Sequence, residues 1–269
     1  MRSFFLLLTT VCLLALPFST AAAATGTADT SAWLDLTQVE DGIVGSSYKA
    51  ADKSTIMLLI AKSGTTYTYK LKASGKTEYF PLQLGDGSYS ISLMEGVGGG
   101  KYKKIGTAAI DLKLSDASRV FLGSVQNVDW KSATAAVAKA KEITKNKKTD
   151  DDKIKAIHDY IVKTISYDSK LSTTVSADYI PDAGRTLKSG KGICYDYSSL
   201  FAVMARSVGI PTKLVMGTSD YVKGYHAWNQ VLNNGKWVII DSTIDASLGK
   251  NVGDTIVKAS GKYTATKLY

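Results

Sequence analysis

The chain has 269 residues, more than one typical domain, and its 45% hydrophobic and 21% charged residues are ordinary for a globular protein. Lysine and arginine outnumber aspartate and glutamate by 33 to 24, and the net charge of +9 favours contact with polyanions. No zinc-finger, helix-turn-helix or RNA-binding motif accompanies this charge. We therefore expect anionic cell-wall polymers as partners and no nucleic acid.

Residues 1–24 have the parts of a secretory signal peptide. Arg2 supplies the positive start, residues 4–16 form an apolar run, and small residues that offer A-x-A cleavage sites follow Pro17. No later segment has the roughly 18 uninterrupted apolar residues that a membrane-spanning helix needs. We expect a secreted or cell-envelope protein without a transmembrane anchor after signal removal; a retained amino-terminal anchor is the alternative.

Residues 25–45 are expected to hold a polar linker and a first strand, and residues 46–116 are expected to form a small all-β sandwich. Four segments alternate between apolar and polar residues, with glycine-rich turn sequences between them. They are residues 56–60, 67–71, 89–93 and 110–114. None of these residues forms a catalytic pattern, which favours a spacer or adhesion module.

From residue 117 the pattern becomes helical, and residues 117–269 are expected to form one α+β domain. The Ala/Lys-rich residues 130–148 indicate a surface helix. Thr149 and the three aspartates after it make a capping-box-like start of the next helix, without the spacing of a calcium loop. Isoleucines recur on one face of that helix at Ile154, Ile157, Ile161 and Ile165. His158 lies within it and is predicted to be structural or at the surface.

Signal removal takes Cys12 away and leaves Cys194 as the single cysteine, which excludes an internal disulfide. Gly190 and Gly192 precede Cys194, and apolar residues at helical spacing follow it. A thiol at a helix N-terminus meets the positive end of the helix dipole, and this favours the thiolate. The same backbone N–H groups can bind a developing oxyanion. Cys194 is thus a candidate nucleophile. The alternatives are a small buried hydrophobe and a disulfide between two copies of the chain, for which an apolar helical segment is an awkward place.

His226 lies in a predicted strand that returns through an Asn-Asn-Gly turn toward Asp241. A turn at residues 234–235 places Asp241 opposite Trp228, whereas a turn at residues 233–234 places it opposite His226. Both registers put Asp241 and His226 on one face of the sheet, and a three-residue loop breaks this parity unless a bulge restores it. An aspartate beside an imidazole can fix its tautomer and stabilise the imidazolium.

A cysteine at a helix start, followed by a histidine and an aspartate on neighbouring strands, suits thiol catalysis. The stretches "GKGICYDYSSLFAVMARSVGIPTKLVMG" and "YHAWNQVLNNGKWVIIDST", with "IKAIHDYIVKTISYD" upstream, resemble the transglutaminase-like superfamily of papain-related enzymes. The resemblance covers roughly residues 130–245 and is to compact, secreted bacterial members. It implies helices packed on an antiparallel sheet behind a small β domain, with no metal and no cofactor.

By this resemblance Cys194 is the nucleophile, His226 the general base and acid, and Asp241 the orienting carboxylate. Tyr167 is a candidate second oxyanion donor or a core residue, and Trp228 is a candidate wall of the acyl site or a packing residue. The implied enzyme is a cysteine acyltransferase or amidohydrolase that acts on carboxamide or peptide bonds of proteins through a thioester. Crosslinking, deamidation and proteolysis all remain open. The alternative is a non-catalytic envelope-binding or adhesion protein with this fold.

Overall fold

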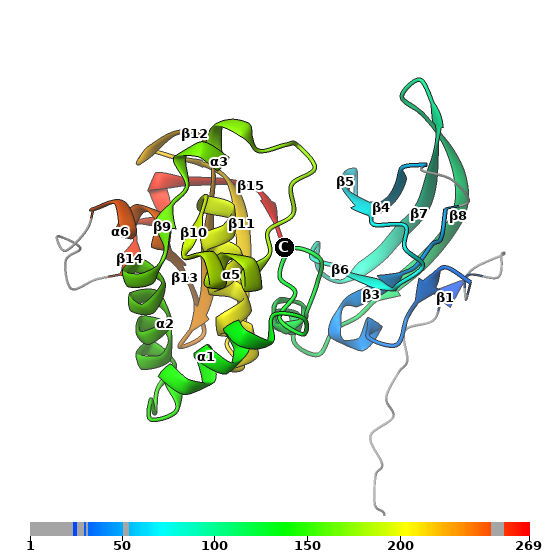
Figure 1. The fold of residues 1–269 in the computed structure, drawn as a ribbon. Coiled ribbons are helices and arrows are strands. Elements are labelled where there is room, and N and C mark those ends of the chain that lie inside the picture. Colours follow the sequence, from blue (N-terminus) through cyan, green and yellow to red (C-terminus); the bar gives the residue numbers. More distant parts are fainter. Residues whose placement is uncertain (1–23, 26–29, 31, 51–53, 249–255) are drawn as a thin grey trace, which may run out of the picture.

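The computed structural model describes residues 24–25, 30, 32–50, 54–248 and 256–269, which form an all-β unit followed by a unit of mixed helices and strands (Figure 1). The predicted signal peptide lies outside the described residues, except for Ala24. Within the described ranges, no helix combines the length and the apolar character needed to span a membrane.

The first unit is the predicted sandwich of two antiparallel sheets. The larger sheet has the order β1-β8-β7-β4-β5, with β1 (Ala24–Thr25), β4 (Ile56–Lys62), β5 (Thr65–Leu71), β7 (Gly87–Gly98) and β8 (Lys101–Leu112). The smaller sheet has the order β2-β3-β6, with β2 (Leu34–Asp35), β3 (Ile43–Ser46) and β6 (Glu78–Pro81). The short helix η1 (Val39–Asp41) lies between β2 and β3, and η2 (Ala117–Leu122) follows the last strand of this unit.

Alternation along the strands explains the sandwich. In β5, Tyr67, Tyr69 and Leu71 are buried and the residues between them are exposed, so one face joins the core. The turn into β5 uses Ser63 and Gly64, whose φ angles of 49° and 81° are both positive. Two residues with positive φ give the turn twist that suits a tight hairpin.

The second unit combines an antiparallel five-stranded sheet with helices, as the sequence predicts. The sheet order is β14-β13-β12-β11-β15, with β11 (Thr212–Ser219), β12 (Val222–Asn233), β13 (Lys236–Ile240), β14 (Val257–Lys258) and β15 (Tyr263–Leu268). The helices are α1 (Thr134–Thr144), α2 (Asp150–Thr164), α3 (Ser169–Thr174), α4 (Ala183–Ser189), α5 (Cys194–Ser207) and α6 (Ser242–Leu248), with η4 (Ser260–Lys262) before the last strand. The short strands β9 (Ser166–Tyr167) and β10 (Lys191–Gly192) pair in parallel.

Helix α5 is the centre of this unit. Every residue from 196 to 206 is buried, because α1, α2 and α4 pack around it together with β11 and β12 (Figure 1). The predicted surface helix is α1, but its Ala136 and Ala140 are fully buried against the core, so only one of its faces meets solvent. The predicted cap of α2 is confirmed, since the Asp152 N–H donates to Thr149 Oγ1 over 3.1 Å.

The two units are joined by hydrogen bonds as well as by the chain. Gln126 Nε2 donates to the carbonyl oxygen of Lys70 in β5 over 2.8 Å. The next residue, Asn127, accepts a 2.8 Å hydrogen bond at its carbonyl oxygen from Ser199 Oγ in α5. Lys70 Nζ also forms a 2.5 Å ion pair with Asp178, in the loop between α3 and α4. Strand β5 is therefore held next to the start of α5.

The packing of α5 leads to a stability prediction. Phe201 is fully buried, so Phe201→Ala will lower the free energy of unfolding by about 3–5 kcal/mol through lost contacts and a residual cavity. Val97 is 59% exposed in the β unit, and Val97→Ala will change it by less than about 0.5 kcal/mol. Urea denaturation of both variants measures the difference. Equal effects contradict the assignment of α5 as the core helix.

Candidate active site

Cys194 is the first residue of α5 and is half-buried. Gly190 ends α4 in the left-handed region, with φ 64°, and turns the chain toward Cys194. At Gly192 an added Cβ would lie 2.5 Å from Asp196 Cβ, so the chain passes too close to the helix for a side chain. The two glycines that mark the motif in the sequence therefore set the position of the thiol.

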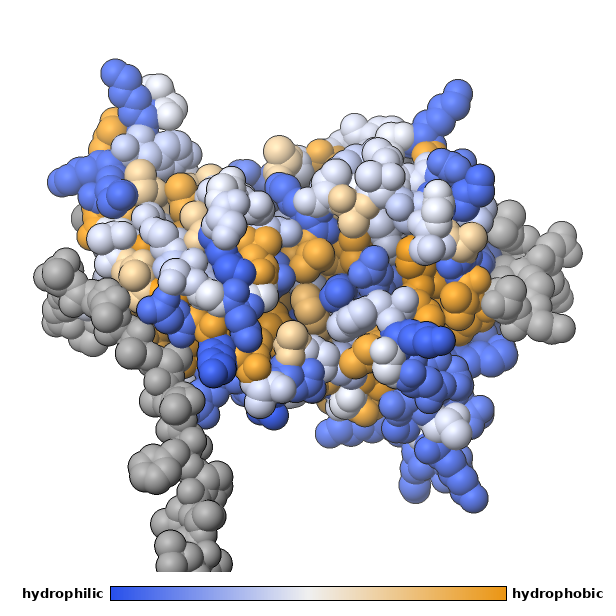
Figure 2. Space-filling view, turned by 180° about the vertical axis from the view of Figure 1, so that it is seen from behind, coloured by the Kyte–Doolittle hydropathy of each residue, from blue (hydrophilic) through white to orange (hydrophobic). Residues whose placement is uncertain are grey.

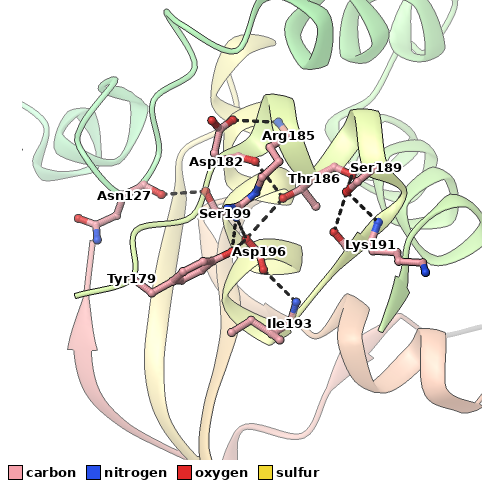
Figure 3. A network of polar contacts seen from close by, with 10 residues as sticks. All are labelled: Asn127, Tyr179, Asp182, Arg185, Thr186, Ser189, Lys191, Ile193, Asp196 and Ser199. Atoms are coloured by element: carbon pink, nitrogen blue, oxygen red, sulfur yellow. Dashed lines mark hydrogen bonds and ion pairs between the residues drawn. The ribbon is translucent and has the colours of Figure 1, made fainter. Parts of the chain in front are cut away.

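A buried carboxylate fixes the start of this helix. Asp196 is fully buried, and its Oδ2 accepts a 2.9 Å hydrogen bond from the Ile193 N–H (Figure 3). Its Oδ1 accepts from Tyr179 Oη over 2.5 Å and from the Arg185 guanidinium over 3.1 Å (Figure 3). A negative charge here suits the positive end of the helix dipole. The sequence motifs do not indicate Tyr179 or Arg185, because both come from a separate segment.

The hairpin between β12 and β13 places His226 near Asp241. Asn233 pairs with Lys236, and Asn234 and Gly235 have φ angles of 48° and 74°, so the turn is at residues 234–235. Of the two registers compatible with the sequence, this is the one that puts Asp241 opposite Trp228. His226 Nε2 lies 2.8 Å from Asp241 Oδ2, diagonally across the sheet.

Asp241 has three polar partners and is only 1% exposed. Besides His226, its Oδ2 accepts a 3.0 Å hydrogen bond from Tyr263 Oη, and its Oδ1 accepts from the Ile244 N–H over 3.1 Å. The second of these bonds caps the start of α6. Tyr263 comes from β15 and is not indicated by any sequence motif.

His226 also contacts the cysteine. Burial lowers the pKa of His226, but hydrogen bonds with Asp241 and Cys194, together with their negative charges, raise it to about 9. Since Nε2 faces Asp241, Nδ1 is the ring nitrogen left for the Cys194 thiol. The structure thus brings Cys194, His226 and Asp241 into one chain of polar contacts, with the imidazole in the middle.

Comparison with known proteins identifies the segment that carries these residues. Residues 137–242 match the family model described as the transglutaminase-like superfamily. These residues form a transglutaminase-like domain. Among proteins with curated descriptions, none matches the chain.

Several solved structures are distantly similar to the chain. A candidate cysteine protease from Cytophaga hutchinsonii is 16% identical, with a TM-score of 0.43 over 82% of this chain and 81% of that one. The periplasmic domain of TgpA from Pseudomonas aeruginosa is 12% identical, with a TM-score of 0.41 over 83% of this chain and 96% of that one. A TGase structure is 19% identical, with a TM-score of 0.35 over 56% of this chain and 44% of that one.

The two aromatic candidates differ in their positions in the transglutaminase-like domain. Trp228 is 1% exposed, stacks on the His226 ring at 6.2 Å and lies 5.0 Å from the Tyr263 ring, so it packs behind the histidine. Tyr167 is 47% exposed and lines a cavity together with Cys194, so it is not a core residue. Burial raises the pKa of Tyr167, and negative charge on Cys194 raises it further.

Cavities open on both sides of the cysteine. One of about 520 Å³ lies between the two units and includes Met57, Thr68 and Lys70 of the β unit in its wall. Another of about 340 Å³ lies against α6. Cys194, Tyr225 and His226 line both. In the space-filling view, apolar surface gathers along the middle of the molecule and hydrophilic side chains project from its ends (Figure 2).

The other histidine of the transglutaminase-like domain is structural, as predicted. His158 is 2% exposed, and its Nε2 lies 2.9 Å from Asp245 Oδ2, which ties α2 to α6. Lys258 Nζ also forms an ion pair with Asp245 Oδ1 over 2.5 Å. Within the described ranges, no group of three or more histidine, cysteine or acidic residues is placed to hold a metal ion.

The His226 contacts predict a pH-dependent contribution to stability. The folded-state pKa of about 9 exceeds the ordinary 6.5, so protonated His226 stabilises the fold fully below about pH 6.5 and loses this effect as the pH rises through about 9. The difference in unfolding free energy between wild type and His226→Gln will shrink by on the order of 3 kcal/mol between pH 6 and pH 10. Urea denaturation at both pH values measures it, and a constant difference contradicts the raised pKa.

Proposed function

We propose that the protein is a secreted or envelope-associated thiol enzyme that acts on carboxamide or peptide bonds of proteins. The observation that carries this proposal is the position of His226, whose Nε2 lies 2.8 Å from the buried Asp241 and which lines two cavities together with Cys194. This arrangement suits a catalytic triad with Cys194 as the nucleophile, His226 as the base and Asp241 as the orienting acid. The cavities on both sides of Cys194 give a substrate access to the thiol.

In the first half of the reaction, His226 takes the proton of the Cys194 thiol, and the sulfur attacks the carbonyl carbon of the amide. The carbonyl electron pair moves to oxygen, and the resulting oxyanion is bound by the backbone N–H of Cys194 at the start of α5. Tyr167 Oη, across the same cavity, is the proposed second donor. As the C–N bond breaks, His226 gives its proton to the leaving nitrogen, so ammonia or an amine departs and a thioester remains.

In the second half, His226 removes a proton from the incoming nucleophile. Attack by water on the thioester gives a carboxylate, whereas attack by an amine gives a new amide. In both cases the C–S bond breaks, and the Cys194 sulfur regains the proton that His226 has taken from the nucleophile. Asp241 keeps the imidazole oriented and stabilises its cationic form in both halves. The protein is thus proposed to be an acyltransferase or an amidohydrolase, and pocket shape decides between water and amine.

The proposed location rests on the sequence. The signal-peptide pattern of residues 1–24 supports export, and the net charge of +9 supports attraction to anionic wall polymers. The β unit adds several exposed lysines to this charge, among them Lys101, Lys103 and Lys104 in the β7–β8 hairpin. We propose protein substrates held near such polymers.

The catalytic role of the thiol has a direct test. Cys194→Ala will reduce ammonia release from casein, a glutamine-rich unfolded protein, and amine incorporation into it by at least about a thousandfold, because no thioester can form. Cys12→Ala is the matched control and will keep wild-type activity, since Cys12 lies in the predicted signal. Equal activity of wild type and Cys194→Ala across several amide substrates favours the non-catalytic binding protein instead.

The contact between Cys194 and His226 has a separate test that needs no substrate. A thiolate paired with an imidazolium persists at pH 6, so His226→Ala will slow iodoacetamide alkylation of Cys194 at that pH by at least about tenfold. His158→Gln is the matched control and will be alkylated at the wild-type rate. Peptide mapping by mass spectrometry follows the label on Cys194, and unchanged labelling of His226→Ala speaks against an ion pair.

A further inference from the structure

Strand β5 has an open edge. Among the residues that the structure describes, it is the last strand of its sheet and pairs only with β4. Gln126 Nε2 donates to the Lys70 carbonyl oxygen and the Lys72 N–H donates to Glu78 Oε1, so the backbone groups of these two residues point away from β4. Along a strand, backbone groups point alternately toward and away from the neighbouring strand. The N–H groups of Thr66 and Thr68, two and four residues before Lys70, therefore also point away from β4. Within the described residues, neither has a partner on that side.

The open edge forms a wall of the larger cavity beside the cysteine. Thr68, Tyr69 and Lys70 line that cavity, and Cys194 and His226 line it from the opposite unit. Figure 1 shows β5 as the strand of the larger sheet that lies toward the helices and strands of the second unit. An extended chain in this cavity therefore has the thiol on one side and unpaired backbone groups of β5 on the other.

Hydrogen bonds connect the open edge of β5 to the helix that carries the thiol. Gln126 binds the carbonyl oxygen of Lys70, while Asn127 binds Ser199 of the helix that begins with Cys194. Two consecutive residues thus hold β5 and α5 together. The ion pair between Lys70 and Asp178 adds a second connection across the same cavity. A substrate that binds β5 is held in register with the thiol.

A second observation in the cavity wall points to a polar ligand. Asn127 is only 5% exposed and lines the cavity, yet its Oδ1 has no hydrogen-bond partner within the described residues. Its Nδ2 donates to Tyr195 Oη, which fixes the amide. A buried acceptor without a partner costs free energy unless a ligand supplies a donor. The backbone N–H of a peptide is such a donor.

We infer that the larger cavity binds the acyl-donor polypeptide in extended form, as an added strand on the open edge of β5, with its carboxamide at Cys194. This inference rests on the proposed function and names its substrate class: an unfolded polypeptide rather than a small amide. Main-chain hydrogen bonds to a sheet edge bind extended peptides with little regard to sequence. The β unit is then part of the active site and not a separate adhesion module.

Hydrogen exchange in the inactive full-length Cys194→Ala protein tests the inference without turnover. At saturating casein, amide exchange in residues 65–71 will slow, while exchange in the β7–β8 hairpin at residues 95–103 will stay unchanged. Casein that slows exchange around Cys194 but not in residues 65–71 overturns the inference. If wild type also shows no Cys194-dependent ammonia release from casein, the proposed function fails instead.

Steady-state kinetics of proline variants in β5 give a second test of the inference. Proline is tolerated where a strand N–H faces outward, so Thr68→Pro removes one donor from the cavity and Thr66→Pro removes the matched donor outside it. Thr68→Pro will raise KM for casein about threefold to tenfold, and will raise KM for a blocked Gln-Gly dipeptide by a smaller factor, because the dipeptide is too short to pair along β5. Thr66→Pro, outside the cavity, will raise KM for casein less than Thr68→Pro does. Equal KM values for casein in the two variants, or an equal loss on casein and dipeptide, contradict the inference.

Discussion

The burial of helix α5 is the constraint on which the rest of the molecule depends. Residues 200–205 of the helix are all apolar and fully buried, so the backbone groups and charges at its two ends must find partners inside the protein. Asp196 does this at the first turn, and Arg206 does it at the last, where the guanidinium donates to carbonyl oxygens of Gly123, Thr212 and Tyr269. The signs of both charges suit the helix dipole. The start of the helix, at Cys194 and Tyr195, lines the cavity between the two units.

The same constraint explains why the dyad of His226 and Asp241 is rigid. Both residues are nearly fully buried. His226 lies in β12, which packs on α5, and Asp241 directly follows β13, which pairs with β12. Asp241 is at once the partner of His226, the acceptor for Tyr263 and the cap of α6. A carboxylate with three donors cannot rotate away from the imidazole without losing all of them. The orientation of the imidazole is therefore a consequence of the fold.

Local patterns in the sequence were sufficient to predict much of this arrangement. The glycines around Cys194, the cap at Thr149 and the Asn-Gly turn are short-range signals, and the parity of the hairpin placed His226 and Asp241 on one face in either two-residue register. Long-range partners could not be predicted in this way. Tyr263 reaches Asp241 from β15, and Tyr179 reaches Asp196 from a loop, because the sheet order and the packing of that loop bring them there. The position of β5 beside the Cys194 thiol also depends on long-range contacts, in this case between the two units, so local sequence patterns could not predict it.

The proposed mechanism requires Cys194 to form a covalent bond to the acyl group of its substrate. Rapid acid quenching of the enzyme during turnover of casein, followed by digestion and mass spectrometry, detects this bond. We expect a transient acyl adduct on the peptide that contains Cys194, sensitive to hydroxylamine as thioesters are. We also expect the adduct to accumulate when amine and water attack are slowed by low pH. Turnover without any adduct on Cys194, or with an adduct on another residue, would contradict the proposed mechanism.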